Sequence, residues 1–195
     1  MEDATVIGER VPEPRKGLAG FWDTFIGPGA TRVDNGLILG AALGGMAAQV
    51  AYALLRPLLW SPLQILVAAV LALDLWGGVI ANALPPARRW YHRPGQGPRQ
   101  LLTFTAVHAF HPAVLVVFFR PGNWAFFAAV YGFLMLAAVI IVFAPRRIQQ
   151  AVALLLTAIG CALLLAAFTP TPGLEWFIPV FYLKLLAGHL PADAG

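Results

Sequence analysis

Six long apolar runs divide most of the chain, and each is near the roughly 20 residues that an α-helix needs to cross a hydrocarbon core of about 30 Å. They cover about residues 34–55, 61–84, 99–119, 123–144, 148–168 and 173–190. Prolines stand in the breaks between the runs, where a missing backbone donor is best tolerated in lipid. The pattern predicts an all-α, polytopic integral membrane protein with six transmembrane helices.

The composition also places the chain in a membrane. Hydrophobic residues make up 59% of it and charged residues 11%, whereas soluble domains carry about 25% charged residues. The formal net charge of +4 comes from basic residues in short clusters beside the apolar runs, which is typical of topology signals and forms no basic stripe. We therefore expect membrane lipids, and no nucleic acid, as partners.

The first part of the chain differs from the rest. Residues 1–16 mix acids, bases and prolines with few large apolar side chains, which predicts a disordered tail. Within residues 17–29, Asp23 and Thr24 fall opposite an apolar face with helical spacing, and Gly27-Pro28-Gly29 closes the segment. That face consists of Leu18, Phe21, Trp22, Phe25 and Ile26. The pattern predicts a short interfacial amphipathic helix.

Lys and Arg residues predict the orientation. The N-terminal segment and the connections at 85–99 and 145–147 carry most of them, whereas the connections at 56–61 and 120–123 carry one arginine each. Cytoplasmic connections of membrane proteins are enriched in these residues. Both termini are therefore predicted to be cytoplasmic, in a bacterial-type plasma (inner) membrane.

Three ionisable residues are expected at one depth in the membrane. An isolated charge near the bilayer centre costs at least about 2.5 to 3.5 kcal/mol of free energy. We therefore expect each such residue to have a compensating partner or a function. Asp74 shares a face of the second run with Asn82, while His108 and His111 lie level with it in the antiparallel third run. We identify Asp74, His108 and His111 as candidate catalytic residues. The alternatives are a structural Asp74–His108 hydrogen bond and a divalent-metal site on these residues, which the pattern permits but does not favour.

Further polar residues could bind a substrate or lipid. Lys184 in the sixth run could snorkel to the interface, pair with Asp74 or contact an anionic substrate. The basic residues of the second connection stand among aromatic residues, an arrangement that suits a phosphate headgroup but also suits simple membrane anchoring. The candidate binding residues are Asn82, Arg88, Arg89, His92, Arg93 and Lys184.

Two features of the runs predict packing. Gly36, Gly40 and Gly44 recur every fourth residue, followed by Ala48, so helix backbones could approach closely either within one subunit or across a homo-oligomer. Pro112 is expected to kink the third run and to free the carbonyl group of the residue four positions earlier, His108.

The sequence leaves three functions open and does not decide whether the protein is an enzyme. The first is a membrane protein with a polar site in the cytoplasmic half of the bundle that acts on or binds a lipid or amphiphile. The second is a small proton- or ion-coupled transporter or channel subunit. The third is a non-catalytic assembly subunit, in which Asp74 and the histidines only fasten helices.

Overall fold

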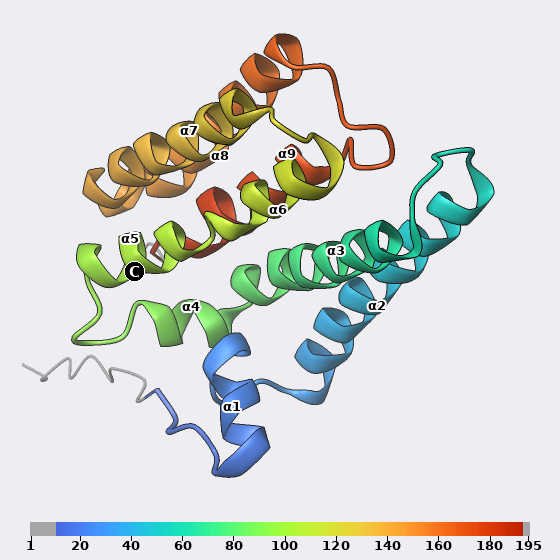
Figure 1. Ribbon diagram of the computed structural model, residues 1–195. Coiled ribbons are helices and arrows are strands. Elements are labelled where there is room, and N and C mark those ends of the chain that lie inside the picture. Colours follow the sequence, from blue (N-terminus) through green and yellow to red (C-terminus); the bar gives the residue numbers. More distant parts are fainter. Residues whose placement is uncertain (1–10, 193–195) are drawn as a thin grey trace, which may run out of the picture.

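The computed structural model describes residues 11–192, and the part of the chain within those limits is all helical, without strands (Figure 1). The all-α fold class is therefore confirmed. Residues 1–10 of the predicted disordered tail lie outside the described residues. The helices are α1 Gly17–Ile26, α2 Arg32–Leu55, α3 Pro62–Ala83, α4 Pro85–Tyr91, α5 Pro98–Val107, α6 Phe110–Phe119, α7 Trp124–Phe143, α8 Arg146–Ala167, α9 Phe177–Tyr182 and the π-helix η1 Leu183–His189.

Five segments of the described chain are long and apolar enough to cross a membrane, which supports an integral membrane protein. They are α2, α3, Pro98–Phe119, α7 and α8. The sixth predicted run contains only a shorter apolar helix, Phe177–His189. At about 1.5 Å per residue it covers roughly 20 Å, less than the hydrocarbon core. The count of six spans is therefore not confirmed.

The sixth run lies in the centre of the fold. Figure 1 shows α9 and η1 passing between the α7–α8 pair and α3, and both elements contact α3 and α8. Phe181, Tyr182, Leu185 and Leu186 have no exposed surface. The Tyr182 hydroxyl satisfies its polar end by donating to the carbonyl oxygen of Val130 at 2.8 Å. Most of this run is apolar because it packs against protein, and Leu183 is its exposed apolar residue.

The backbones of α2 and α3 approach closely through glycine. A Cβ on Gly77 would lie 2.8 Å from the Cβ of Ala42, and one on Gly45 would lie 2.6 Å from Cδ1 of Trp76. By contrast, nothing lies within 4 Å of a Cβ on Gly36, Gly40 or Gly44. The interpretation of that strip as a contact within one subunit is therefore wrong, because α2 packs on α3 with another face. A homo-oligomer through the strip stays a prediction.

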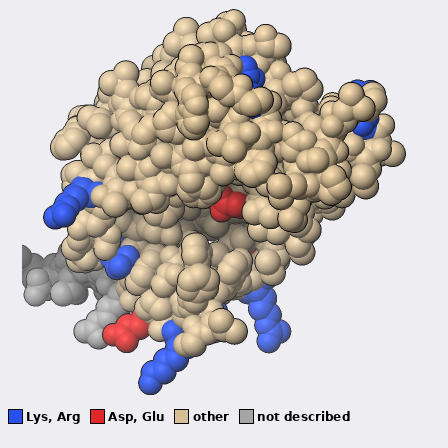
Figure 2. Space-filling view, viewed as in Figure 1, with Lys and Arg blue, Asp and Glu red and all other residues tan. Residues whose placement is uncertain are grey.

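The connections meet at two opposite ends of the bundle. At one end, Arg88 of α4 donates to the carbonyl oxygen of Pro191 at 3.2 Å and to the side chain of Gln150 of α8 at 3.5 Å. At the other end, Arg120 donates to the carbonyl oxygen of Thr169 at 2.7 Å. Figure 2 shows Lys and Arg side chains gathered mainly around the end that holds α1 and α4. Which end faces the cytoplasm stays a prediction.

Polar contacts join α1 to the segment before it and to α4. Asp23 is only 2% exposed and accepts hydrogen bonds from the backbone N–H and the guanidinium of Arg15 at 2.7 to 2.9 Å. The hydroxyl of Tyr91, in α4, donates to the carbonyl oxygen of Thr24 at 3.1 Å. Gly27 follows α1 with φ +85°, where a Cβ would overlap the backbone of Pro86.

The apolar residues of α1 divide between two surroundings. Leu18 and Phe21 are strongly exposed, whereas Ile26 is buried against α2 and α3 residues. The exposed side chains are those that a membrane surface would cover. The position of α1 at the interface stays a prediction.

Candidate functional site

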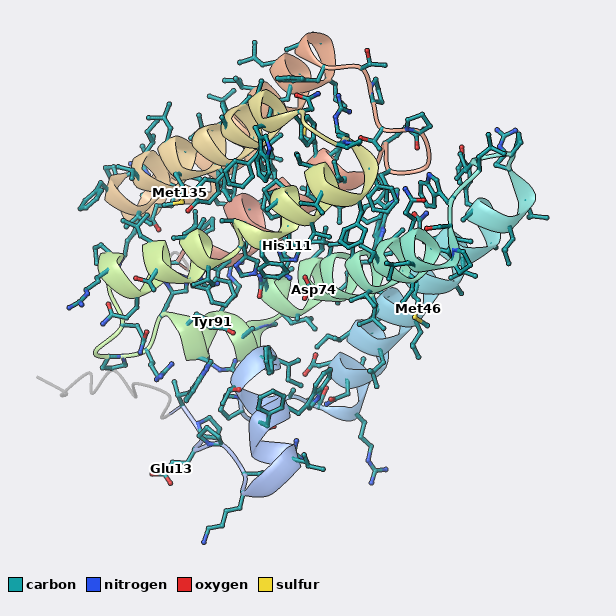
Figure 3. The ribbon with its side chains drawn as sticks, viewed as in Figure 1. Glu13, Met46, Asp74, Tyr91, His111 and Met135 are labelled. Atoms are coloured by element: carbon teal, nitrogen blue, oxygen red, sulfur yellow. The ribbon has the colours of Figure 1, made fainter. Side chains whose placement is uncertain are left out.

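Asp74 of α3 joins three helices. Its Oδ2 atom accepts a hydrogen bond from Lys184 Nζ of η1 at 2.6 Å and one from His111 Nε2 of α6 at 2.7 Å. Figure 3 shows Asp74 and His111 facing each other across the space between α3 and α6. An ammonium and a carboxylate at this distance form an ion pair that compensates both charges in a low-dielectric setting.

Gly78 and Asn82, one and two turns after Asp74, both contact Lys184. A Cβ on Gly78 would lie 2.7 Å from Lys184 Cδ and 2.9 Å from its Nζ, so a side chain at position 78 would displace the end of the lysine. Asn82 donates from Nδ2 to the carbonyl oxygen of Lys184 at 3.0 Å. Lys184 itself lies in a π-helix, a rare conformation that is frequent at functional sites. Lys184 pairs with Asp74 and does not snorkel.

The chain breaks between α5 and α6, where Pro112 was expected to kink it. Pro112 offers no N–H to the carbonyl oxygen of His108, and the backbone N–H of His111 takes its place at 3.1 Å. The His111 ring atom Nδ1 lies 3.3 Å from the same oxygen. The break brings the two imidazole rings parallel, with 5.2 Å between centroids and 5° between planes.

The partner of Asp74 is His111, so the predicted Asp74–His108 hydrogen bond is wrong. His108 Nδ1 instead lies 2.7 Å from the carbonyl oxygen of Phe104. A carbonyl oxygen only accepts, so we assign the proton to Nδ1, which leaves Nε2 of a neutral His108 as an acceptor. His111 has two such contacts, and the shorter one decides: Nε2 lies 2.7 Å from the carboxylate and Nδ1 lies 3.3 Å from a carbonyl oxygen, so we assign its single proton to Nε2.

Asp74, His108, His111 and Lys184 lie along one cavity of about 380 Å³. Its size falls within the range of about 300 to 1,000 Å³ that is usual for small-molecule sites. The other lining residues are mostly apolar: Trp22, Phe25, Ile26, Ile38, Ala42, Leu73, Gly77, Gly78, Ala81, Asn82, Tyr91, Phe104, Val107 and Phe110.

The mouth of the cavity is apolar and exposed. Phe25, Leu73, Val107 and Phe110 line it and are each more than one-third exposed. Where Figure 3 labels Asp74, Figure 2 shows an acidic side chain inside a hollow of the surface. These rim residues belong to α1, α3, α5 and α6, so in a membrane the mouth would open sideways toward lipid chains.

The basic residues of the second connection stand apart from this cavity, because none of Arg88, Arg89, His92 and Arg93 lines it. His92 Nε2 lies 3.1 Å from the carbonyl oxygen of His189. The guanidinium of Arg93 lies 3.4 Å from the centre of the Trp90 ring, as a cation–π contact. Arg88 holds the end of η1, as described above. Binding of a headgroup by this connection stays a prediction.

A cluster of three rings was not predicted: Tyr91 and Phe104 line the cavity and His189 packs against both. Phe104 stacks on His189 with 3.9 Å between centroids, and Tyr91 meets His189 edge-on at 4.8 Å. Burial raises the pKa of the Tyr91 phenol to about 12, so it stays a hydrogen-bond donor to α1. Both ring nitrogens of His189 lack a hydrogen-bond partner among the described residues. Lys184 and His189 are five residues apart, which is the hydrogen-bond spacing of a π-helix. The α-helical periodicity assumed from the sequence does not place two such residues on one face.

The donor set does not fit a divalent metal ion. Within residues 11–192 no three His, Cys, Asp or Glu side chains are arranged to hold one. The Lys184 ammonium lies against the Asp74 oxygen that a metal would use, and His111 turns its proton to the same oxygen. We therefore assign no role to a metal here.

Comparison of the chain with protein-family models, with curated proteins and with solved structures found no match.

Proposed function

We propose that this integral membrane protein binds an amphiphile in the cavity, with the polar head of the ligand against Asp74, Lys184 and His111. The proposal includes the predicted setting: a six-segment bundle in a bacterial-type inner membrane, with cytoplasmic termini and the cavity in the cytoplasmic half. The cavity has an apolar mouth above a polar floor, which consists of the side chains of Asp74, Lys184, His108 and His111. An amphiphile fits this arrangement because its chain matches the mouth and its head matches the floor.

The exposure of Asp74 carries the proposal. Its side chain is 46% exposed, while those of His111 and Lys184 are 1% and 6% exposed. If the ion pair only fastened helices, we would expect its carboxylate to be enclosed by protein, because an open cavity beside it adds no packing contacts. Here the partners are buried and the carboxylate faces the cavity. This favours a ligand site over the assembly subunit.

Transport is the weaker alternative. Leu115, Phe177 and Phe181 are almost fully buried and belong to the apolar core. Leu115 lies one turn beyond His111 toward the far end of α6, and the Phe181 ring packs against His111 at 5.5 Å. A proton or ion that reached Asp74 would meet this apolar layer next, so the site is better suited to binding than to passage.

The test narrows the mouth of the cavity. Leu73→Trp places a large ring at the rim, and Val70→Trp, one turn earlier on α3, is the control because Val70 is exposed but does not line the cavity. We expect the purified protein to carry amphiphiles detectable by mass spectrometry, and Leu73→Trp to carry several-fold less than the parent. Equal amounts in both tryptophan variants, or no bound amphiphile in the parent, would contradict the proposal.

A further inference from the structure

The polar floor of the cavity keeps hydrogen-bonding capacity that no described residue uses. Both partners of Asp74 contact Oδ2, so Oδ1 of a half-exposed carboxylate remains free to accept. His108 donates from Nδ1 to a backbone carbonyl, so its Nε2 is a second free acceptor on a residue that lines the same cavity. Lys184 Nζ has three protons and uses one for Asp74. The floor can therefore accept from a ligand and donate to it.

The charges of the floor already cancel. Asp74 and Lys184 form an ion pair, and the neutral imidazoles of His108 and His111 add no charge. A carboxylate head would bring a second negative charge to Asp74, and an ammonium head would bring a second positive charge to Lys184. Either would add an uncompensated charge to a site walled by apolar side chains, which is costly. The balance favours an uncharged head.

Building on the proposed function, we propose that the ligand is a long-chain alcohol, whose single hydroxyl is the polar head. A hydroxyl is the smallest uncharged group that both donates and accepts, so it can donate to His108 Nε2 or to Asp74 Oδ1 while it accepts from a free proton of Lys184. A cavity of about 380 Å³ holds the head and the first part of a chain, and the remainder leaves between the exposed rim residues Val107 and Phe110.

The experiment compares three ligands of equal chain length. Hexadecanol, hexadecanoate and hexadecylamine are titrated against the full chain in nanodiscs of zwitterionic lipid, and displacement of radiolabelled hexadecanol is measured. We expect hexadecanol to bind at least about tenfold more tightly than either charged compound, because a buried unpaired charge is more costly than a satisfied hydroxyl.

Two variants test the role of the imidazole. His108→Phe keeps a ring of similar shape but removes the acceptor, and hexadecanol affinity should fall several-fold while the preference over the charged ligands shrinks. The control is Tyr131→Phe, which removes the hydroxyl that donates to the carbonyl oxygen of Ala106 at 3.1 Å, outside the cavity. This control should bind hexadecanol like the parent. A His108→Phe variant that is folded and binds hexadecanol with unchanged affinity would overturn the assignment of Nε2 as the acceptor.

The outcomes separate this inference from the proposed function. If hexadecanoate or hexadecylamine binds more tightly than hexadecanol, and Leu73→Trp weakens that binding, the cavity binds amphiphiles but the alcohol inference is wrong. If none of the three compounds binds, or if Leu73→Trp leaves binding unchanged, the proposed function itself fails.

Discussion

Gly78 allows the Asp74–Lys184 ion pair to form, because the lysine crosses α3 where a side chain would otherwise stand. Its Cδ and Nζ atoms lie 2.7 and 2.9 Å from the position of a Cβ on Gly78, and Nζ then reaches the carboxylate one turn earlier. The lysine side chain is 6% exposed, and the cavity that it lines is the space into which an added side chain would push it. A side chain at position 78 would therefore change the geometry of the floor.

We expect Gly78→Ala to displace Lys184 from Asp74 and to destabilise the protein by about 1 to 3 kcal/mol, the usual cost of overpacking. The control is Gly132→Ala on α7, where nothing lies within 4 Å of the added Cβ and alanine is the better helix former. Thermal unfolding in detergent measures both. If the two variants unfold at the same temperature as the parent, Lys184 does not depend on Gly78.

At this scale the sequence predicted the meeting of Asp74 with the histidines but not its details. Helix geometry sets the depth of each residue, and depth alone placed His108, His111 and Asp74 near one another. The choice of His111 over His108 depends on the break between α5 and α6. Periodicity assumes an unbroken helix, and the kink expected at Pro112 did not indicate which imidazole would face Asp74.

Helix α1 shows the same limit at the scale of an element. Its apolar spacing predicted a helix that begins at Gly17, and the structure has one from Gly17 to Ile26. Asp23 was expected on the polar face, yet it is buried against Arg15. That partner precedes the helix in a segment without periodicity, so no helical pattern relates the two residues. The contact fixes the preceding segment to α1, whose Trp22 and Phe25 line the cavity.

The Arg15–Asp23 contact predicts a dependence on pH. Hydrogen bonds from Arg15 lower the pKa of the Asp23 carboxyl below its usual value, which is about 3.9 in an unfolded chain. A lowered pKa means that the contact contributes stability above the unfolded value and loses it as the pH falls through the folded one. We therefore expect α1 to become sensitive to protease below about pH 4, measured with an acid-active protease in detergent.

Two variants check the cause of this pH dependence. Arg15→Gln should expose α1 to the protease already at neutral pH, because it removes the ion pair that lowers the pKa. Asp23→Asn cannot titrate, so its protease sensitivity should not change between pH 6 and pH 3. A pH dependence that persists in Asp23→Asn would assign the effect to another carboxyl group.

For the whole molecule, hydropathy predicted membrane insertion but not which face of each apolar segment meets lipid. Most side chains of Phe177–His189 are buried in protein, and hydropathy alone does not separate that setting from a lipid one. The first span shows the converse. Its regular glycines suggested the contact with a neighbouring helix, whereas the structure uses Ala42 and Gly45 for that contact and leaves the regular strip open. The sequence shows small residues on two faces of α2 but does not show which face packs on α3.

Gly44 and Gly45 lie next to each other in α2 but face different surroundings. A side chain at Gly45 meets Trp76 of α3, so Gly45→Leu should destabilise the subunit by about 1 to 3 kcal/mol through overpacking. Nothing lies within 4 Å of a Cβ on Gly44, so Gly44→Leu should leave the unfolding of one subunit unchanged within about 0.5 kcal/mol.

Thermal unfolding and the mass of the detergent-solubilised particle, measured together, distinguish the two faces of α2. A stable Gly44→Leu subunit that separates from a larger assembly would show that the open strip is an interface between copies, because leucine keeps backbones apart where only close contact held them. A stable variant with an unchanged particle mass would show that the strip faces lipid. Destabilisation of Gly44→Leu equal to that of Gly45→Leu would contradict the arrangement of α2 on α3 from which both expectations follow.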